Sequence, residues 1–155
     1  MSRSFEVIER LAGKGKTLAT AESCTGGGIG AALTAVPGSS TVYKGGVISY
    51  TNEIKMKVLG VREELLKKYG AVSTWVAGEM VSGVRELLQT DIAVSVTGLA
   101  GPGGDEFGRP VGTVFIGYQD CHRSLVKHYL FDGDRDAVRA QTIEATLEMI
   151  LEYNP

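Results

Sequence analysis

The stretch 17–30, TLATAESCTGGGIG, decides the fold, because it holds both a strand and the start of the helix that follows. Residues 17–21 are small or apolar and lead into a polar cluster, which predicts a short buried strand. Apolar residues then recur at helical spacing until Pro37-Gly38 ends the pattern. The polar residues 22–27 therefore lie where a strand becomes a helix.

The same patterns continue outward and alternate helix with strand. Further strands are predicted at 42–50, 92–97, 111–118 and 124–131, the last two as an antiparallel hairpin. Helices are predicted around 5–11, at 63–69, along 76–88 and after 132–134, with a short one that carries Lys55 and Leu59. This order predicts a single three-layer α/β/α domain over residues 1–155, with a mixed, mostly parallel sheet.

Composition and charge narrow the classes of function. The chain has 155 residues, with 16 Lys plus Arg and 18 Asp plus Glu, so its net charge of −2 argues against nucleic acid as a partner. We expect no membrane contact and no export, since no apolar run approaches the roughly 20 residues of a bilayer span. Cys24 and Cys121 are isolated, without CxxC or Cys/His spacing. They predict buried free thiols in a reduced, cytoplasmic setting, and no metal site.

Residues 26–31, GGGIGA, satisfy the G-x-G-x-x-A fingerprint of dinucleotide-binding folds. That fingerprint also needs an acidic residue at the end of the next strand, where this chain has Ser49-Tyr50-Thr51-Asn52, so a Rossmann site is not predicted. Two interpretations of the glycines stay open. Exposed amides at the helix start could bind an anion, or the glycines could only let the helix pack closely on the sheet.

Ser23 lies at the strand-to-helix junction, where a hydroxyl can be a nucleophile or simply cap the helix. A Ser-His-Asp triad is not predicted, because there is no G-x-S-x-G and both His122 and His128 fall in or beside the late hairpin. A nucleophilic serine would then need another base, and burial can lower the pKa of a lysine enough for that role. Lys55, one helical turn beyond Tyr50, is the candidate; the alternative is a solvated lysine on a short helix.

Two further features allow either a binding role or a plain structural one. Arg135 and Arg139 are four residues apart on one helix face, so they can together hold a phosphate or carboxylate, or pair with the neighbouring aspartates. The aperiodic loop from Gly98 to Gly108 has the length of a binding loop or lid, or is ordinary surface.

Several separate blocks of the sequence resemble the CinA C-terminal family. The blocks are AESCTGG (21–27), VPGSS (36–40), GGVISYTNEIK (45–55), GAVS (70–73), SVTGLAGPGG (95–104), PVGTV (110–114) and GDR (133–135). They occur in the family's order and span nearly the whole chain. The resemblance implies nicotinamide-nucleotide amidase activity, which hydrolyses the carboxamide of nicotinamide mononucleotide to nicotinic acid mononucleotide and ammonia.

The resemblance also implies roles for particular residues. The family's catalytic serine, tyrosine and lysine correspond to Ser23, Tyr50 and Lys55. The expected substrate-binding residues are Thr25, Gly26 and Gly27, whose amides would stabilise an oxyanion, and Thr97, Gly98 and Arg135, which would hold the ribose phosphate. No metal or other cofactor is expected.

Two other functions stay open on the sequence: a nucleotide-binding or regulatory module without catalysis, and an amidase for a different carboxamide. The joint presence of Ser23, Tyr50 and Lys55 favours an enzyme, because a pure binder needs no serine and lysine pair. The resemblance implies a homo-oligomer. The resemblance covers the amidase domain, whereas many family members carry a further N-terminal pyrophosphatase-type domain. We therefore expect the amidase domain to stand alone here.

Overall fold

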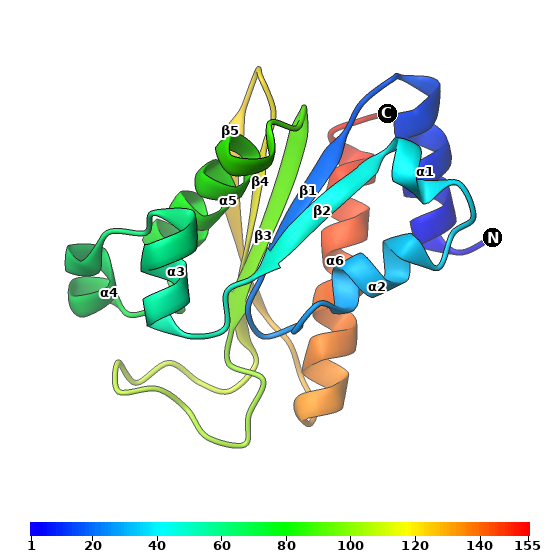
Figure 1. Ribbon diagram of the computed structural model, residues 1–155. Helices are drawn as coiled ribbons and strands as arrows, with labels where there is room; N and C mark the ends of the chain where they lie inside the picture. The colour runs from blue at the N-terminus through cyan, green and yellow to red at the C-terminus, as the bar shows by residue number, and fades with distance from the viewer.

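The computed structural model describes residues 1–155 and contains one five-stranded sheet, in the order β2-β1-β3-β4-β5 (Figure 1). The strands are β1 (Leu18–Glu22), β2 (Tyr43–Ile48), β3 (Ile92–Gly98), β4 (Thr113–Gln119) and β5 (Ser124–Leu130). β2 and β3 pair in parallel with β1, whereas β4 is antiparallel to both β3 and β5. Only β4 therefore runs against the other strands, and the predicted mixed, mostly parallel sheet with its late hairpin is confirmed.

The helices form the two outer layers of the molecule (Figure 1). One face of the sheet carries α1 (Arg3–Gly13), α2 (Gly28–Thr34) and α6 (Arg135–Glu152). The other face carries α3 (Asn52–Leu59), α4 (Glu63–Tyr69) and α5 (Thr74–Leu88), and a 3-10 turn (Ser39–Thr41) leads into β2. The three-layer α/β/α architecture is thus confirmed. None of the helices combines the length and hydropathy that crossing a bilayer requires.

Each outer layer closes its own apolar core against the sheet. On the α1, α2 and α6 side the core contains 20 buried residues, and on the α5 side it contains 10. Strand periodicity divides β3 between them: Ile92 and Val94 face the larger core, and Ala93 faces the smaller one. The small side chain of Ala93 lets α5 lie close to the middle of the sheet. The central strands are therefore buried on both faces, which fixes the positions of their ends.

Two strand ends differ from the sequence prediction by two residues, and the others lie within one residue of it. The second strand ends at Ile48 rather than residue 50, because Ile48 pairs with Glu22, the last residue of β1, and beyond it only the Ser49 amide still donates to the Glu22 carbonyl oxygen. The fourth strand begins at Thr113 rather than residue 111. Gly112 has a φ of 96°, and a Cβ there would collide with the backbone oxygen of Phe131, so the chain is still turning at this residue.

Candidate active site

Three parallel strands end at one edge of the sheet, and the polar residues that follow them converge there. A cavity of about 250 Å³ opens at this edge, between the β1–α2 turn, α3, the end of β3 and the start of α6. Its lining residues are Ser23, Cys24, Tyr50, Asn52, Lys55, Ala71, Val72, Thr97, Gly98, Ala100 and Arg135. The structure therefore brings all three predicted catalytic residues to one cavity.

The turn that carries Ser23 is built around the buried carboxylate of Glu22. This side chain is 2% exposed and accepts hydrogen bonds from the Thr25 hydroxyl (2.6 Å) and from the first free amides of α2, Ile29 (2.9 Å) and Gly30 (3.0 Å). A carboxylate is the favoured group at a helix N-terminus. Glu22, which the sequence analysis missed, therefore caps α2, and the interpretation of Ser23 as the cap is wrong.

The same capping decides between the two interpretations of the glycines in favour of close packing. The start of α2 already holds an anion from its own chain, so its first amides are occupied. A Cβ at Gly28 would lie 2.7 Å from Ile143 Cδ1, and one at Gly30 would lie 2.8 Å from the Tyr43 hydroxyl oxygen. These glycines therefore let α2 pack against the sheet and α6.

Lys55 reaches the cavity from the buried face of α3. Thr51 caps this helix through the Ile54 amide (3.3 Å), and Lys55 lies four residues before Leu59 on the side that faces the core. The Lys55 side chain is 1% exposed, so the interpretation of it as a solvated lysine is wrong. Its Nζ lies 3.1 Å from Ser23 Oγ.

Two backbone carbonyl groups hold the Lys55 amine against Ser23. Lys55 Nζ donates to the carbonyl oxygens of Ser49 (2.8 Å) and Tyr50 (3.2 Å). Burial, with no carboxylate beside the amine, lowers the pKa of Lys55 from 10.5 to about 8. A neutral amine has two N–H groups and one lone pair. With both N–H groups on carbonyl oxygens, the lone pair is directed to the Ser23 hydroxyl and can accept its proton.

Cys24 follows Ser23 in the turn and contributes a second potential nucleophile to the cavity wall. Burial raises the pKa of the Cys24 thiol to about 11, so the thiol stays protonated at neutral pH and unreactive. Ser23 is thus the group with an adjacent base. The prediction of a buried free thiol is confirmed for Cys24 but wrong for Cys121, which is exposed in the β4–β5 turn.

Arg135 connects Tyr50 to the long loop between β3 and β4. Its Nη2 donates to the Tyr50 hydroxyl (3.1 Å), and its Nη1 donates to the carbonyl oxygen of Gly101 (2.8 Å). The Tyr50 ring is 58% exposed, while the Tyr50 carbonyl oxygen contacts Lys55. Arg139, one turn further along α6, donates to the carbonyl oxygens of Cys24 and Thr25. The alternative that these arginines pair with neighbouring aspartates is therefore wrong.

The remaining predicted binding residues divide into two groups. Thr97 and Gly98 line the cavity, and the Thr97 hydroxyl donates to the carbonyl oxygen of Ala71 (2.9 Å), which ties β3 to the α4–α5 connection. Thr25, Gly26 and Gly27 belong to the β1–α2 turn but are absent from the cavity lining. The Gly26 amide already donates to the Ser23 carbonyl oxygen (3.1 Å).

The loop 99–112 is fastened beside the cavity. Arg109 Nη2 donates to the Tyr69 carbonyl oxygen (2.7 Å), and its Nη1 lies 3.4 Å from the Asp105 carboxylate. Phe107 packs against Gly70, where a Cβ would lie 2.6 Å from the ring. A second cavity of about 300 Å³ lies under this loop and shares Asn52, Ala71 and Val72 with the first. These three residues therefore border both cavities.

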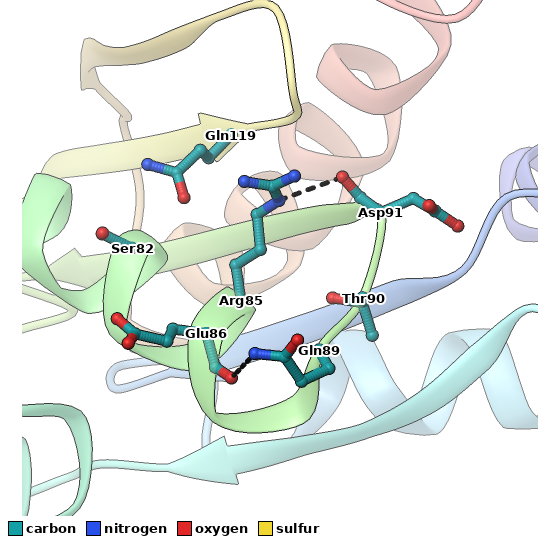
Figure 2. A pocket seen from close by; sticks show the side chains of 7 residues that line it. All are labelled: Ser82, Arg85, Glu86, Gln89, Thr90, Asp91 and Gln119. Atoms are coloured by element: carbon teal, nitrogen blue, oxygen red, sulfur yellow. Dashed lines mark hydrogen bonds between the residues drawn. The ribbon is translucent and has the colours of Figure 1, made fainter.

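A larger hollow, of about 380 Å³, lies at the opposite end of β3 and is lined only by polar residues (Figure 2). Two of its long side chains bond to backbone: Arg85 Nε donates to the Asp91 carbonyl oxygen (3.1 Å), and Gln89 Nε2 donates to the Glu86 carbonyl oxygen (2.7 Å). This hollow has no nucleophile beside a base, so size alone does not identify the site. No group of three or more His, Cys, Asp or Glu side chains is arranged to hold a metal ion.

Fold and site together place the chain among three-layer α/β/α proteins that pair a serine with a buried lysine at the end of a parallel strand. Within that class, the chain belongs to the CinA C-terminal domain family, whose model matches residues 2–154.

Individual relatives agree with this membership. The chain is 45% identical over 147 residues to a "CinA-like protein" of Thermotoga maritima and 46% identical over 149 residues to a "Putative competence-damage inducible protein" of Halothermothrix orenii. These matches cover 95% and 96% of this chain but 36% of each relative, so the chain spans about a third of the length of these curated relatives.

Solved structures of the family have the same fold. A competence or damage-inducible protein from Enterobacter asburiae superposes with a TM-score of 0.96 at 33% identity, covering 99% of this chain and 96% of that one. A CinA superfamily protein from Klebsiella pneumoniae superposes with a TM-score of 0.94 at 37% identity, covering 97% and 94%.

Proposed function

We propose that this chain hydrolyses the carboxamide of nicotinamide mononucleotide to nicotinic acid mononucleotide and ammonia, through an acyl-enzyme on Ser23. The observation that carries the proposal is the contact of 3.1 Å between Lys55 Nζ and Ser23 Oγ, with the lysine 1% exposed. A serine alone is a weak nucleophile, and an adjacent base with a lowered pKa is what activates it. Membership of the CinA family supports the substrate, as the sequence blocks around these residues do.

The first half of the reaction breaks the C–N bond. Neutral Lys55 accepts the proton of the Ser23 hydroxyl while Oγ bonds to the carboxamide carbon, and the carbonyl oxygen becomes an oxyanion. When this intermediate collapses, the protonated Lys55 gives its proton to the departing nitrogen, which leaves as ammonia. Because Lys55 Nζ and Ser23 Oγ are in direct contact, the proton transfer from Ser23 to Lys55 needs no intervening group.

The second half hydrolyses the ester formed on Ser23. Water adds to the acyl carbon while Lys55 accepts its proton, and the proton returns to Ser23 Oγ as the carboxylic acid is released. Tyr50, whose hydroxyl is held by Arg135 at the mouth of the cavity, is assigned to contact with the substrate. Proton transfer from Ser23 to Lys55 through the Tyr50 hydroxyl is the alternative route.

The volume of the cavity is consistent with the binding of one small ring. Its volume of about 250 Å³ is below the range of roughly 300–1,000 Å³ of complete small-molecule sites. We therefore assign the nicotinamide ring to this cavity and the ribose phosphate to the space near Arg135. Thr97 and Gly98 would contact the substrate from the end of β3. Thr25, Gly26 and Gly27 remain proposed as part of the surroundings of the oxyanion.

One assay tests the proposal against its alternatives: ammonia release from nicotinamide mononucleotide, nicotinamide, its riboside and the dinucleotide. We expect the mononucleotide to be the best substrate. Faster release from another compound would indicate an amidase for a different carboxamide. Binding of the mononucleotide without ammonia release from any compound would indicate a regulatory module.

Two variants complete this assay. Ser23→Ala should abolish ammonia release while leaving the circular dichroism spectrum and Tm unchanged, since the only hydrogen bond of the hydroxyl is the one with Lys55. Ser40→Ala, which changes an exposed serine in the 3-10 turn, is the matched control and should keep full activity. Substantial turnover by Ser23→Ala would remove Ser23 from the nucleophile role.

A further inference from the structure

Arg139 is a cation whose hydrogen bonds all end on the backbone that follows Ser23. Its Nε donates to the Cys24 carbonyl oxygen (3.0 Å), and its Nη2 donates to the Thr25 carbonyl oxygen (3.1 Å). Arg139 takes part in none of the ion pairs of the chain. The charge of Arg139 is therefore not neutralised by any carboxylate. Its two acceptors are neutral carbonyl groups, 115 residues away in the sequence for Cys24 and 114 for Thr25.

The Cys24 amide is the one in this turn that has both a free N–H and a place on the cavity. The Ser23 amide donates to the Val96 carbonyl oxygen (3.1 Å) and the Gly26 amide donates to the Ser23 carbonyl oxygen (3.1 Å), whereas the Cys24 amide donates to no backbone carbonyl group. Cys24 lines the cavity, and Thr25 is fully buried outside it. In serine hydrolases the amide that follows the nucleophile is a common donor to the oxyanion.

Both peptide planes that flank Cys24 are pinned. The peptide group before it is held by the bond from the Gly26 amide to the Ser23 carbonyl oxygen. The peptide group after it is held by Arg139 Nε on the Cys24 carbonyl oxygen. With both planes fixed, the direction of the Cys24 N–H is fixed as well. An oxyanion donor is effective only when its direction is set before the reaction.

We infer that the Cys24 amide donates to the oxyanion, and that Arg139 is the positioning residue: it holds the peptide group after Cys24, which restricts rotation of the backbone at Cys24, and it places a positive charge behind the turn. This inference rests on the proposed acyl-enzyme at Ser23. Arg139 acts through the backbone and touches no substrate, so its removal should lower kcat and leave KM nearly unchanged.

The test compares Arg139→Met and Arg139→Lys with the wild type for kcat, KM and Tm in ammonia release from nicotinamide mononucleotide. Arg10→Met is the matched control, because Arg10 also donates to two backbone carbonyl oxygens, those of Leu151 and Asn154, at the far end of α6. Loss of an oxyanion donor lowers kcat about 100- to 1,000-fold, and misplacement of one should cost part of that.

We expect Arg139→Met to lower kcat about 10- to 100-fold with KM within about threefold, and Arg10→Met to keep kcat within about twofold. Arg139→Lys keeps the charge and can reach one carbonyl oxygen, so its kcat should lie between the two. If Arg139→Met does not fold, the lysine variant carries the test through a loss of kcat at unchanged Tm. Wild-type kcat in Arg139→Lys and Arg139→Met, or a rise in KM at constant kcat, would overturn the inference.

A second measurement separates this inference from the choice of substrate. In the reaction with a fluorophosphonate, Ser23 Oγ bonds to phosphorus, fluoride leaves and Lys55 takes the hydroxyl proton, and the phosphonyl P=O oxygen occupies the oxyanion position. The labelling rate at Ser23, followed by mass spectrometry, should fall in the Arg139 variants by the same factor as kcat. Labelling of the wild type without ammonia release would overturn the proposed substrate alone, and the rates would still decide the role of Arg139. No reaction at Ser23 in either assay would overturn both.

Discussion

The proposed reaction predicts a pH dependence that follows from the surroundings of Lys55. Burial lowers its pKa to about 8, and only the neutral amine can accept the proton of Ser23. The experiment therefore changes the pH from 6 to 9.5 at constant ionic strength. Across this range the fraction of enzyme with neutral Lys55 should set the rate.

The expected magnitude comes directly from this pKa. With a pKa of about 8, the neutral fraction is about 1% at pH 6, about 9% at pH 7, about 50% at pH 8 and about 97% at pH 9.5. The rate should thus rise about tenfold between pH 6 and 7, about 50-fold between pH 6 and 8, and then level off. A lysine with the ordinary pKa of 10.5 would instead give a rise of about tenfold per pH unit through pH 9.5.

The assay is the initial rate of ammonia release at saturating nicotinamide mononucleotide. Saturation matters, because kcat reports the pKa of the enzyme–substrate complex and not the titration of the substrate phosphate. Lys55→Arg should be inactive at every pH, since a guanidinium group does not deprotonate. Lys57→Arg, on the exposed side of the same helix, should keep the wild-type profile.

Two results would contradict this role of Lys55 as a neutral base. A kcat that stays flat or falls between pH 6 and 8 would mean that the active form carries a protonated lysine. A kcat that continues to rise tenfold per unit beyond pH 9 would mean that burial does not lower the pKa of Lys55 in the working enzyme.

Three further predictions follow from the site. Glu22→Gln should lower the free energy of unfolding by about 2 kcal/mol in urea titrations, because an amide cannot accept from all three donors of the turn; an unchanged midpoint would contradict the capping role. Arg135→Ala should raise KM for the mononucleotide more than for its riboside, and equal effects would remove Arg135 from phosphate binding. Ammonia release should persist after dialysis against a chelator, whereas its loss, restored by added metal, would replace Lys55 with metal-bound water as the activating group.

The fold follows from local patterns that the tertiary structure does not override. Small and apolar residues in β1 and β3 mark strands buried on both faces, and Pro37-Gly38 and Gly70 end helical patterns near the predicted places. Element ends were less accessible to prediction. The second strand stops at Ile48 because of where its neighbour ends, which is information that lies 26 residues earlier in the chain.

The site was predictable in its residue types but not in its contacts. For Lys55 a signal existed, since it lies four residues before Leu59 on the buried face of a short helix, where an apolar residue is normally found. For Glu22 no such signal existed, and the helical spacing that singled out Arg139 predicted an anion or a neighbouring aspartate as its partner rather than backbone carbonyl groups. Glu22 resembles any acid at a strand end, and Arg139 finds its acceptors only after α6 has packed against the first strand's turn.

The Ser23 and Lys55 side chains come from segments separated by 32 positions, and their contact depends on β1 lying beside β2 and on α3 turning back over the sheet. An unfolded or partly folded chain has a fully hydrated, protonated lysine and no base for the serine. The recovery of hydrolysis during renaturation would therefore report when β1, β2 and α3 pack together. Its delay after the return of the helical circular dichroism signal would measure how late in folding this packing occurs.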